Sequence, residues 1–182
     1  AGLATQLAIA VSFAVNGTTG LRLALAHPDG IWEQAYFDAQ DAALYKADSE
    51  GDYSYRGDDP DAYDDVFDQK AGEDDLEPLI DFLDFINNAD DATFAAELAD
   101  RLDVDAFAAY LAMQDMLGNF DDIDGPGNNS YLHYDGASGQ FTVVNWDLNL
   151  AFGTSNVNGG GPGGGAAGGQ PGGGQLDGGQ PG

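Results

Sequence analysis

The N-terminal part of the chain alternates apolar runs with turn residues. Residues 8–15, AIAVSFAV, and residues 21–26, LRLALA, are apolar and suited to β-strands, and Asn16-Gly17 lies between them. Asn-Gly is a strong signal for a β-hairpin, because both residues tolerate the positive φ angles of its tight turn. The pattern therefore predicts two strands joined by a hairpin turn.

A weaker pattern follows between residues 28 and 75. Residues 28–46 open with Pro28-Asp29-Gly30 and then space their apolar side chains as in a helix. This spacing predicts a short helix. Residues 47–75 are polar and rich in Asp, with a few scattered aromatic side chains. Such a composition predicts a long surface loop.

Apolar side chains at helical spacing dominate the next part of the chain, and three helices are expected there. The first runs from Leu76 to a close at Asn87-Asn88. The second begins in the cap region around Asp91 and Thr93 and reaches Leu102. The third begins at Asp103 or Asp105 and ends at Gly118-Asn119.

A second hairpin is predicted after the polar loop of residues 120–129. SYLHYD (130–135) and FTVVNWD (141–147) are β-prone segments separated by turn residues. If Tyr131–Tyr134 pairs with Phe141–Val144, the polar loop and Asp147 come to the same end of the ladder. From residue 159 onward the chain is Gly, Pro and Gln with too little apolar content for a core. We therefore expect an α+β domain over residues 1–153 and a disordered tail over residues 154–182.

The charge of the chain is extreme and narrows the classes of partner. There are 32 Asp and Glu against 5 Lys and Arg, a formal net charge of −27. Nucleic acid is excluded as a partner by repulsion, and most of the acids are expected on a solvated surface of halophilic type. There is no cysteine, which excludes disulfides and thiolate sites. No apolar run is long enough to span a membrane, and the N-terminal segment lacks the basic region of a signal peptide.

Oxygen-bearing side chains are expected to converge at the end of the second hairpin. Asp121 follows the third helix, Asn129 closes the loop, and Asp147 ends the last strand. Carboxylate and amide oxygens, completed by phosphates, suit Mg²⁺. A loop Asp, an Asn a few residues later and an Asp after a hairpin also follow the plan of a protein-kinase active site. The competing hypothesis is that these acids serve only as surface solvation.

A calcium loop of the EF-hand type does not fit the same stretch. Starting at Asp122, the fifth position is Pro126 and the twelfth is His133, where the motif requires an acid and a Glu. Starting at Asn119, the fifth position is Ile123. Both histidines of the chain, His27 and His133, are expected to pack or to face solvent rather than to bind metal.

Several motifs in order resemble the CotH protein-kinase family, the spore coat protein H type. The segments are DVDAFAAYLAMQDMLGNFDD, NNSYLHYD and GQFTVVNWDLNLAFG. Family members carry D-V-D-x-F-x-x-Y, G-N-x-D, N-Y-Y-L-Y and P-W-D-x-x-x-A-F-G. Upstream, FAVNGTTGLRLALAHPDGIWEQAYF and ALYK are similar to the family's Asn-Gly hairpin, its following helix and its Leu-Tyr-Lys. The resemblance covers about residues 1–153.

The resemblance implies an atypical protein-kinase-like fold with hairpins and a small helical lobe, truncated at its N-terminus. It implies transfer of the γ-phosphoryl group of ATP, with Mg²⁺, to Ser or Thr of secreted or surface (coat-type) proteins, and an extracellular or cell-surface location. Carried over residue by residue, Asp121 takes the catalytic role. Asn129 and Asp147 take the roles of metal- and cofactor-binding residues. Because the loop is longer than in the family, Asp122 and Asp124 remain alternatives to Asp121.

The chain departs from the family pattern at several positions. Asn145 stands where the family has Pro before Trp-Asp, Ser130 where a Tyr follows the Asn, and Asn149 where a later acid is usual. The phosphate-binding Lys is expected upstream of residue 1, and neither Lys46 nor Lys70 is assigned that role. The alternative function is therefore a catalytically inactive binding or structural module of a halophilic surface protein.

Overall fold

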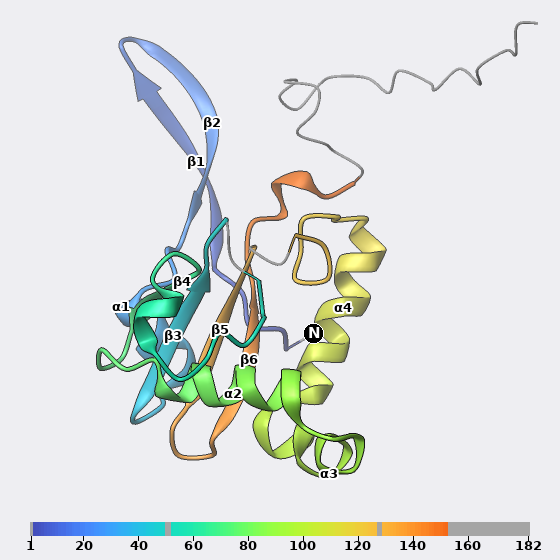
Figure 1. Ribbon diagram of the computed structural model, residues 1–182. Coiled ribbons are helices and arrows are strands. Elements are labelled where there is room, and N and C mark those ends of the chain that lie inside the picture. Colours follow the sequence, from blue (N-terminus) through green and yellow to red (C-terminus); the bar gives the residue numbers. More distant parts are fainter. Residues whose placement is uncertain (1, 50–51, 127–128, 153–182) are drawn as a thin grey trace, which may run out of the picture.

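The computed structural model describes residues 2–49, 52–126 and 129–152 (Figure 1). It is an α+β fold, as expected, and its elements in chain order are β1 (Ala8–Val15), β2 (Thr18–Leu25), α1 (Gly30–Phe37), β3 (Ala42–Ala47), η1 (Pro60–Tyr63), β4 (Phe67–Ala71), α2 (Glu77–Asn88), α3 (Asp91–Arg101), α4 (Val104–Leu117), β5 (Ser130–Asp135), β6 (Gln140–Asn145) and η2 (Leu148–Leu150). The expected tail over residues 154–182 lies outside the described residues.

Both predicted hairpins are confirmed. The first, β1–β2, turns at Asn16-Gly17 and projects from the body of the molecule (Figure 1). The second, β5–β6, pairs Tyr131 with Val144 and Tyr134 with Phe141, the register predicted from the sequence. It forms half of a four-stranded antiparallel sheet in the order β4-β3-β5-β6.

The remaining two strands of this sheet correct the sequence-based expectation. The helix predicted within residues 28–46 ends at Phe37, and residues 42–47 form β3 instead. AALYKA shows no clear alternation of apolar and polar residues, because most of its residues are buried within the sheet. The spacing of its apolar residues alone cannot distinguish such a strand from a helix. The loop predicted over residues 47–75 contains β4, a short edge strand whose polar residues are half-buried.

The three predicted helices are confirmed to within a few residues. Asp29, Asp90 and Asp103 cap the N-termini of α1, α3 and α4, each with its carboxylate accepting from backbone N–H groups. Gly118 ends α4 in the left-handed region, with a φ of 60°. Part of the large acid content therefore caps helices, where a carboxylate satisfies orphan N–H groups and the helix dipole.

Two apolar layers enclose the sheet. On one face α2 buries Leu79 and Leu83 against the side chains of Tyr45, Leu132 and Phe141, together with residues of α3 and α4. On the other face a smaller cluster joins the N-terminal segment and α1 to the sheet; its buried members are Ala4, Trp32, Leu44, Tyr131 and Val144. Among the described residues, none of the helices has the length and apolar run needed to cross a membrane.

A buried acid–imidazole pair joins α1 to β5. His133 Nε2 lies 2.9 Å from Glu33 Oε1, and its ring stacks on Phe37 with the ring centroids 3.5 Å apart. Both polar side chains are buried. Burial lowers the pKa of His133, and the hydrogen bond and charge of Glu33 offset this only in part. His133 thus packs against the sheet, as expected.

We expect acid to destabilise the fold through His133. Because burial holds the pKa of His133 below 6.5, the unfolded chain takes up a proton that the folded chain does not. This contribution to stability is complete above that pH and is lost as the pH falls below it, by at most about 1.4 kcal/mol per pH unit. Urea unfolding of the wild type and of His133→Gln over the range of about pH 5 to 8 measures the effect.

The comparison of variants isolates the pair of His133 and Glu33, because the titration of the other acids cancels in the difference. His27→Gln, at the exposed histidine, should keep the wild-type pH dependence. Equal slopes for the wild type and His133→Gln would contradict the assignment.

Candidate functional site

The candidate site lies at the end of the sheet where β5 begins. Ser130, the first residue of β5, pairs with Asn145, the last residue of β6. Lys46, near the end of β3, pairs with Tyr131. Asn129, Asp147 and the end of β3 therefore come from three chain segments to the same edge of the sheet.

Two of the three predicted residues are in direct contact. The side-chain amide of Asn129 donates from Nδ2 to Oδ2 of Asp121 over 2.7 Å. Both side chains are half-buried. A cation bound by Asn129 would use the other atom of the amide, the oxygen Oδ1. The contact joins the two ends of the loop that follows α4.

The alternative acids of the same loop lie in different surroundings. Asp122 is buried, and its Oδ1 accepts from the backbone N–H groups of Asp124 (3.1 Å) and Gly125 (3.0 Å). Burial raises the pKa of Asp122, although these two hydrogen bonds act in the opposite direction. Asp124 is exposed. Asp122 thus holds the loop conformation, whereas Asp121 faces Asn129.

Asp147 occupies a strained position at the end of the last strand. Its backbone is in the left-handed region, with φ 46° and ψ 75°, which few residues other than Gly adopt. Its carboxylate accepts from the N–H of Asn149 (3.3 Å) and starts the short helix η2. Buried Val144 and Leu150 fix the chain on either side. The half-buried carboxylate is therefore held at the junction of two packed segments.

Lys46 is a candidate that sequence reasoning left unassigned. Its Nζ lies 5.6 Å from the centre of the Tyr131 ring and donates to the carbonyl of Ala47. Partial burial lowers the pKa of Lys46, while the charges of nearby acids, among them Asp147, act to raise it. Lys46 and Asp147 thus lie at the same end of the sheet. The missed signal was the strand itself: ALYK, read as β3, places Lys46 one residue from the strand end.

A buried chain of amides connects the two segments that carry the acids. Gln114 of α4 donates from Nε2 to Oδ1 of Asn145 (2.7 Å) and accepts at Oε1 from Nδ2 of Asn119 (2.9 Å). Asn145 in turn lies within 3.3 Å of the hydroxyl of Thr5. Gln114, Asn119 and Asn145 are each at most 5% exposed. Asn119 lies two positions before Asp121, and Asn145 lies two positions before Asp147. Sequence reasoning gave the three amides no role in the site.

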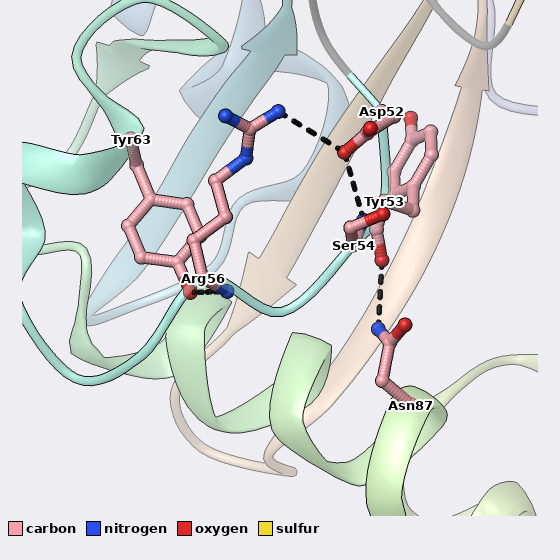
Figure 2. A network of polar contacts seen from close by, with 6 residues as sticks. All are labelled: Asp52, Tyr53, Ser54, Arg56, Tyr63 and Asn87. Atoms are coloured by element: carbon pink, nitrogen blue, oxygen red, sulfur yellow. Dashed lines mark hydrogen bonds and ion pairs between the residues drawn. The ribbon is translucent and has the colours of Figure 1, made fainter.

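The segment of residues 52–58 lies beside the start of β5. The Tyr53 hydroxyl is 2.7 Å from Oγ of Ser130, the neighbour of Asn129. Figure 2 shows how this segment is held: Asn87 of α2 donates to the carbonyl of Tyr53, and Arg56 forms an ion pair with Asp52 over 3.2 Å. The start of β5 is therefore supported from outside the sheet as well as from β6.

The donor set at this edge fits a magnesium ion that keeps further ligands from phosphates or water. Within the described ranges, no three His, Asp or Glu side chains come together as a metal-binding group. Mg²⁺ in phosphoryl-transfer sites needs only one or two carboxylates from the protein, since phosphate oxygens and waters complete its octahedron. Asp147 and Asn129 offer a carboxylate and an amide oxygen of that kind.

Comparison with protein-family models identifies the family of the chain. The model of the family described as CotH kinase protein matches residues 1–177, nearly the whole chain. No curated protein matches the chain.

Proposed function

Because the chain belongs to the CotH kinase protein family, we propose that it is an atypical protein kinase that transfers the γ-phosphoryl group of ATP to Ser or Thr hydroxyls. The observation that carries the proposal is the contact between Asn129 and Asp121 at the sheet edge that also holds Asp147 and Lys46. Phosphoryl transfer requires positioning and charge stabilisation, and these four groups supply both.

Each of these residues has a distinct role in the proposal. Asp121 orients the acceptor hydroxyl and takes its proton as the oxygen–phosphorus bond forms and ADP leaves with the electrons of the broken bond. The hydrogen bond from Asn129 fixes the Asp121 carboxylate in place. Asn129 and Asp147 would hold Mg²⁺, and the Lys46 ammonium would face phosphate charge. When bound, Mg²⁺ supplies neutralisation of the phosphate oxygens.

The setting of the activity is part of the proposal. The acceptor is taken to be a secreted or surface protein of coat type, and the location extracellular or at the cell surface, as the resemblance of the motifs implies. The kinase-like unit is assigned to residues 1–153, with residues 154–182 as a tail. The net charge of −27 supports a protein adapted to high salt, where counterions screen the repulsion between its acids.

A catalytically inactive module is the second candidate. It is favoured by Asn149, a neutral residue where the family pattern usually has an acid, and by the use of the Asp147 carboxylate to cap its own turn. Such a module would bind cations or other proteins without transferring phosphate. Binding of Mg²⁺ and ATP without transfer would identify it.

The test is transfer of labelled phosphate from γ-labelled ATP by the full chain in molar potassium chloride. We expect incorporation into the chain itself or into a Ser- and Thr-rich protein when Mg²⁺ is present, because a bound Mg²⁺ would neutralise the phosphate oxygens during transfer. Chelation by EDTA should abolish incorporation, and added Mg²⁺ should restore it. Incorporation that persists in EDTA, or absence of both binding and transfer, would contradict the proposal.

A further inference from the structure

The residue before Trp146-Asp147 is Asn145, a polar residue that is 4% exposed at the end of β6. A polar side chain buried to this extent needs hydrogen-bond partners. Its backbone N–H donates to the carbonyl of Ala4 (2.8 Å), and its side chain bonds to Gln114 and Thr5. The strand end that leads to Asp147 is therefore fixed by hydrogen bonds.

Gln114 connects this strand end to the loop of Asp121. One amide uses both of its polar atoms: Nε2 donates to Asn145, and Oε1 accepts from Asn119. The backbone carbonyl of Gln114 also accepts from the N–H of Asn119 over 3.1 Å. A second link between the same two segments is the bond from the Phe152 N–H to the carbonyl of Leu117 (2.6 Å). The end of α4 thus lies between the loop of Asp121 and the segment of Asp147.

The burial of these amides makes the connection strong. Gln114 is 1% exposed, so bulk water could not replace the hydrogen bonds of its amide if they were broken. Among the three amides of Gln114, Asn119 and Asn145, the oxygen Oδ1 of Asn119 is already buried without a hydrogen-bond partner among the described residues. Removing the Gln114 amide would leave further buried polar atoms unpaired, and the two segments would move until they regained partners.

We propose that Gln114 is a positioning residue that sets the place of Asp147 relative to Asp121 for phosphoryl transfer. The inference rests on the proposed function. It assigns to this chain a side-chain bridge between the end of β6 and the loop that follows α4. Catalysis that depends on positioning is sensitive to shifts of about 1 Å, which can cost on the order of a hundredfold in rate.

The test compares Gln114→Met with Gln140→Met in the full chain. Met keeps the length of the side chain and removes the hydrogen bonds of the amide. Gln140 lies at the opposite end of β6 from Asn145, and its Nε2 donates to the carbonyl of Ala99 over 2.7 Å, so it is a control for loss of the same amide away from the site. Hydrogen exchange of the unliganded protein is followed in peptides that cover residues 119–126 and 145–152. The Mg²⁺ concentration for half-maximal transfer is measured in parallel.

Gln114→Met should raise exchange in both peptides and raise the half-saturating Mg²⁺ concentration about tenfold. Gln140→Met should change neither. Both variants are assayed below the onset of their thermal unfolding, where nearly all molecules are folded, so a loss of global stability alone would not change the half-saturating concentration. If only one peptide responds, or if Mg²⁺ dependence is unchanged, the proposal is wrong.

A second variant applies if Gln114→Met does not fold. Asn119→Ser removes the donor to Gln114 and keeps the bond between Gln114 and Asn145. It should raise exchange in residues 119–126 and not in residues 145–152, and the opposite pattern would overturn the proposal. If the wild type neither binds nor uses ATP, the proposed function fails, while the exchange data still decide whether Gln114 couples the two segments.

Discussion

Asp147→Asn is expected to fold as the wild type does and to lose at least about a hundredfold in the rate of phosphate transfer. Asn is nearly the same size, tolerates the left-handed backbone at this position, and can still accept from the N–H of Asn149 through its amide oxygen. What it loses is the negative charge. That charge would bind Mg²⁺, and in the unliganded protein it acts to raise the pKa of Lys46.

The matched control is Asp100→Asn, because Asp100 is exposed and lies on α3, outside the candidate site. Both variants remove one negative charge from a protein with a net charge of −27, so the control corrects for any effect of the change in net charge on the rate. Initial rates with γ-labelled ATP and thermal unfolding are compared for the three proteins. Wild-type transfer by Asp147→Asn would remove Asp147 from the site, and equal losses in both variants would point to bulk charge alone.

The elements that were predicted from the sequence are those whose signals are local. The turn at Asn16-Gly17, the register of β5 with β6 and the Asp103 cap of α4 each depend on residues close in the chain. The strands β3 and β4 were missed because their form depends on partners far away. Most of β3 is buried between β4 and β5, so the alternation that marks a strand is absent from its sequence.

In the candidate site, too, the residues with a local sequence signal were predicted and those that depend on distant contacts were not. The order of motifs led to Asp121, Asn129 and Asp147, and the hairpin register explains why Asn129 and Asp147 share one edge of the sheet. Their roles stay predictions. The contributions of Gln114 and Asn145 could not be predicted, because a polar residue on a helix reveals nothing of a buried partner 31 positions away. Lys46 was overlooked for the same reason as its strand.

Gly125→Ala is expected to disturb the site through the backbone alone. A Cβ at this position would lie 2.0 Å from the carbonyl oxygen of Phe120, a contact that only a backbone shift can relieve. The N–H of Gly125 also donates to the carbonyl and carboxylate of Asp122, so the shift breaks the turn that shapes the loop. We expect a loss of about 1–3 kcal/mol in unfolding free energy. Phosphate transfer should fall by about a hundredfold, because Asp121 moves with Phe120.

Gly30→Ala serves as the control for adding a methyl group to this protein. Its Cβ would meet only Ala71, at an ordinary 3.7 Å, and the position begins α1, where Ala is favourable. Stability should be unchanged or slightly raised, with wild-type transfer. Hydrogen exchange in residues 119–126 then distinguishes a local change of the loop from a loss of global stability. In Gly125→Ala, exchange in this loop should rise under conditions in which the rest of the protein stays folded. If Gly125→Ala loses transfer while hydrogen exchange in residues 119–126 stays at the wild-type level, the loss does not come from a displaced Asp121 loop, and the prediction is wrong.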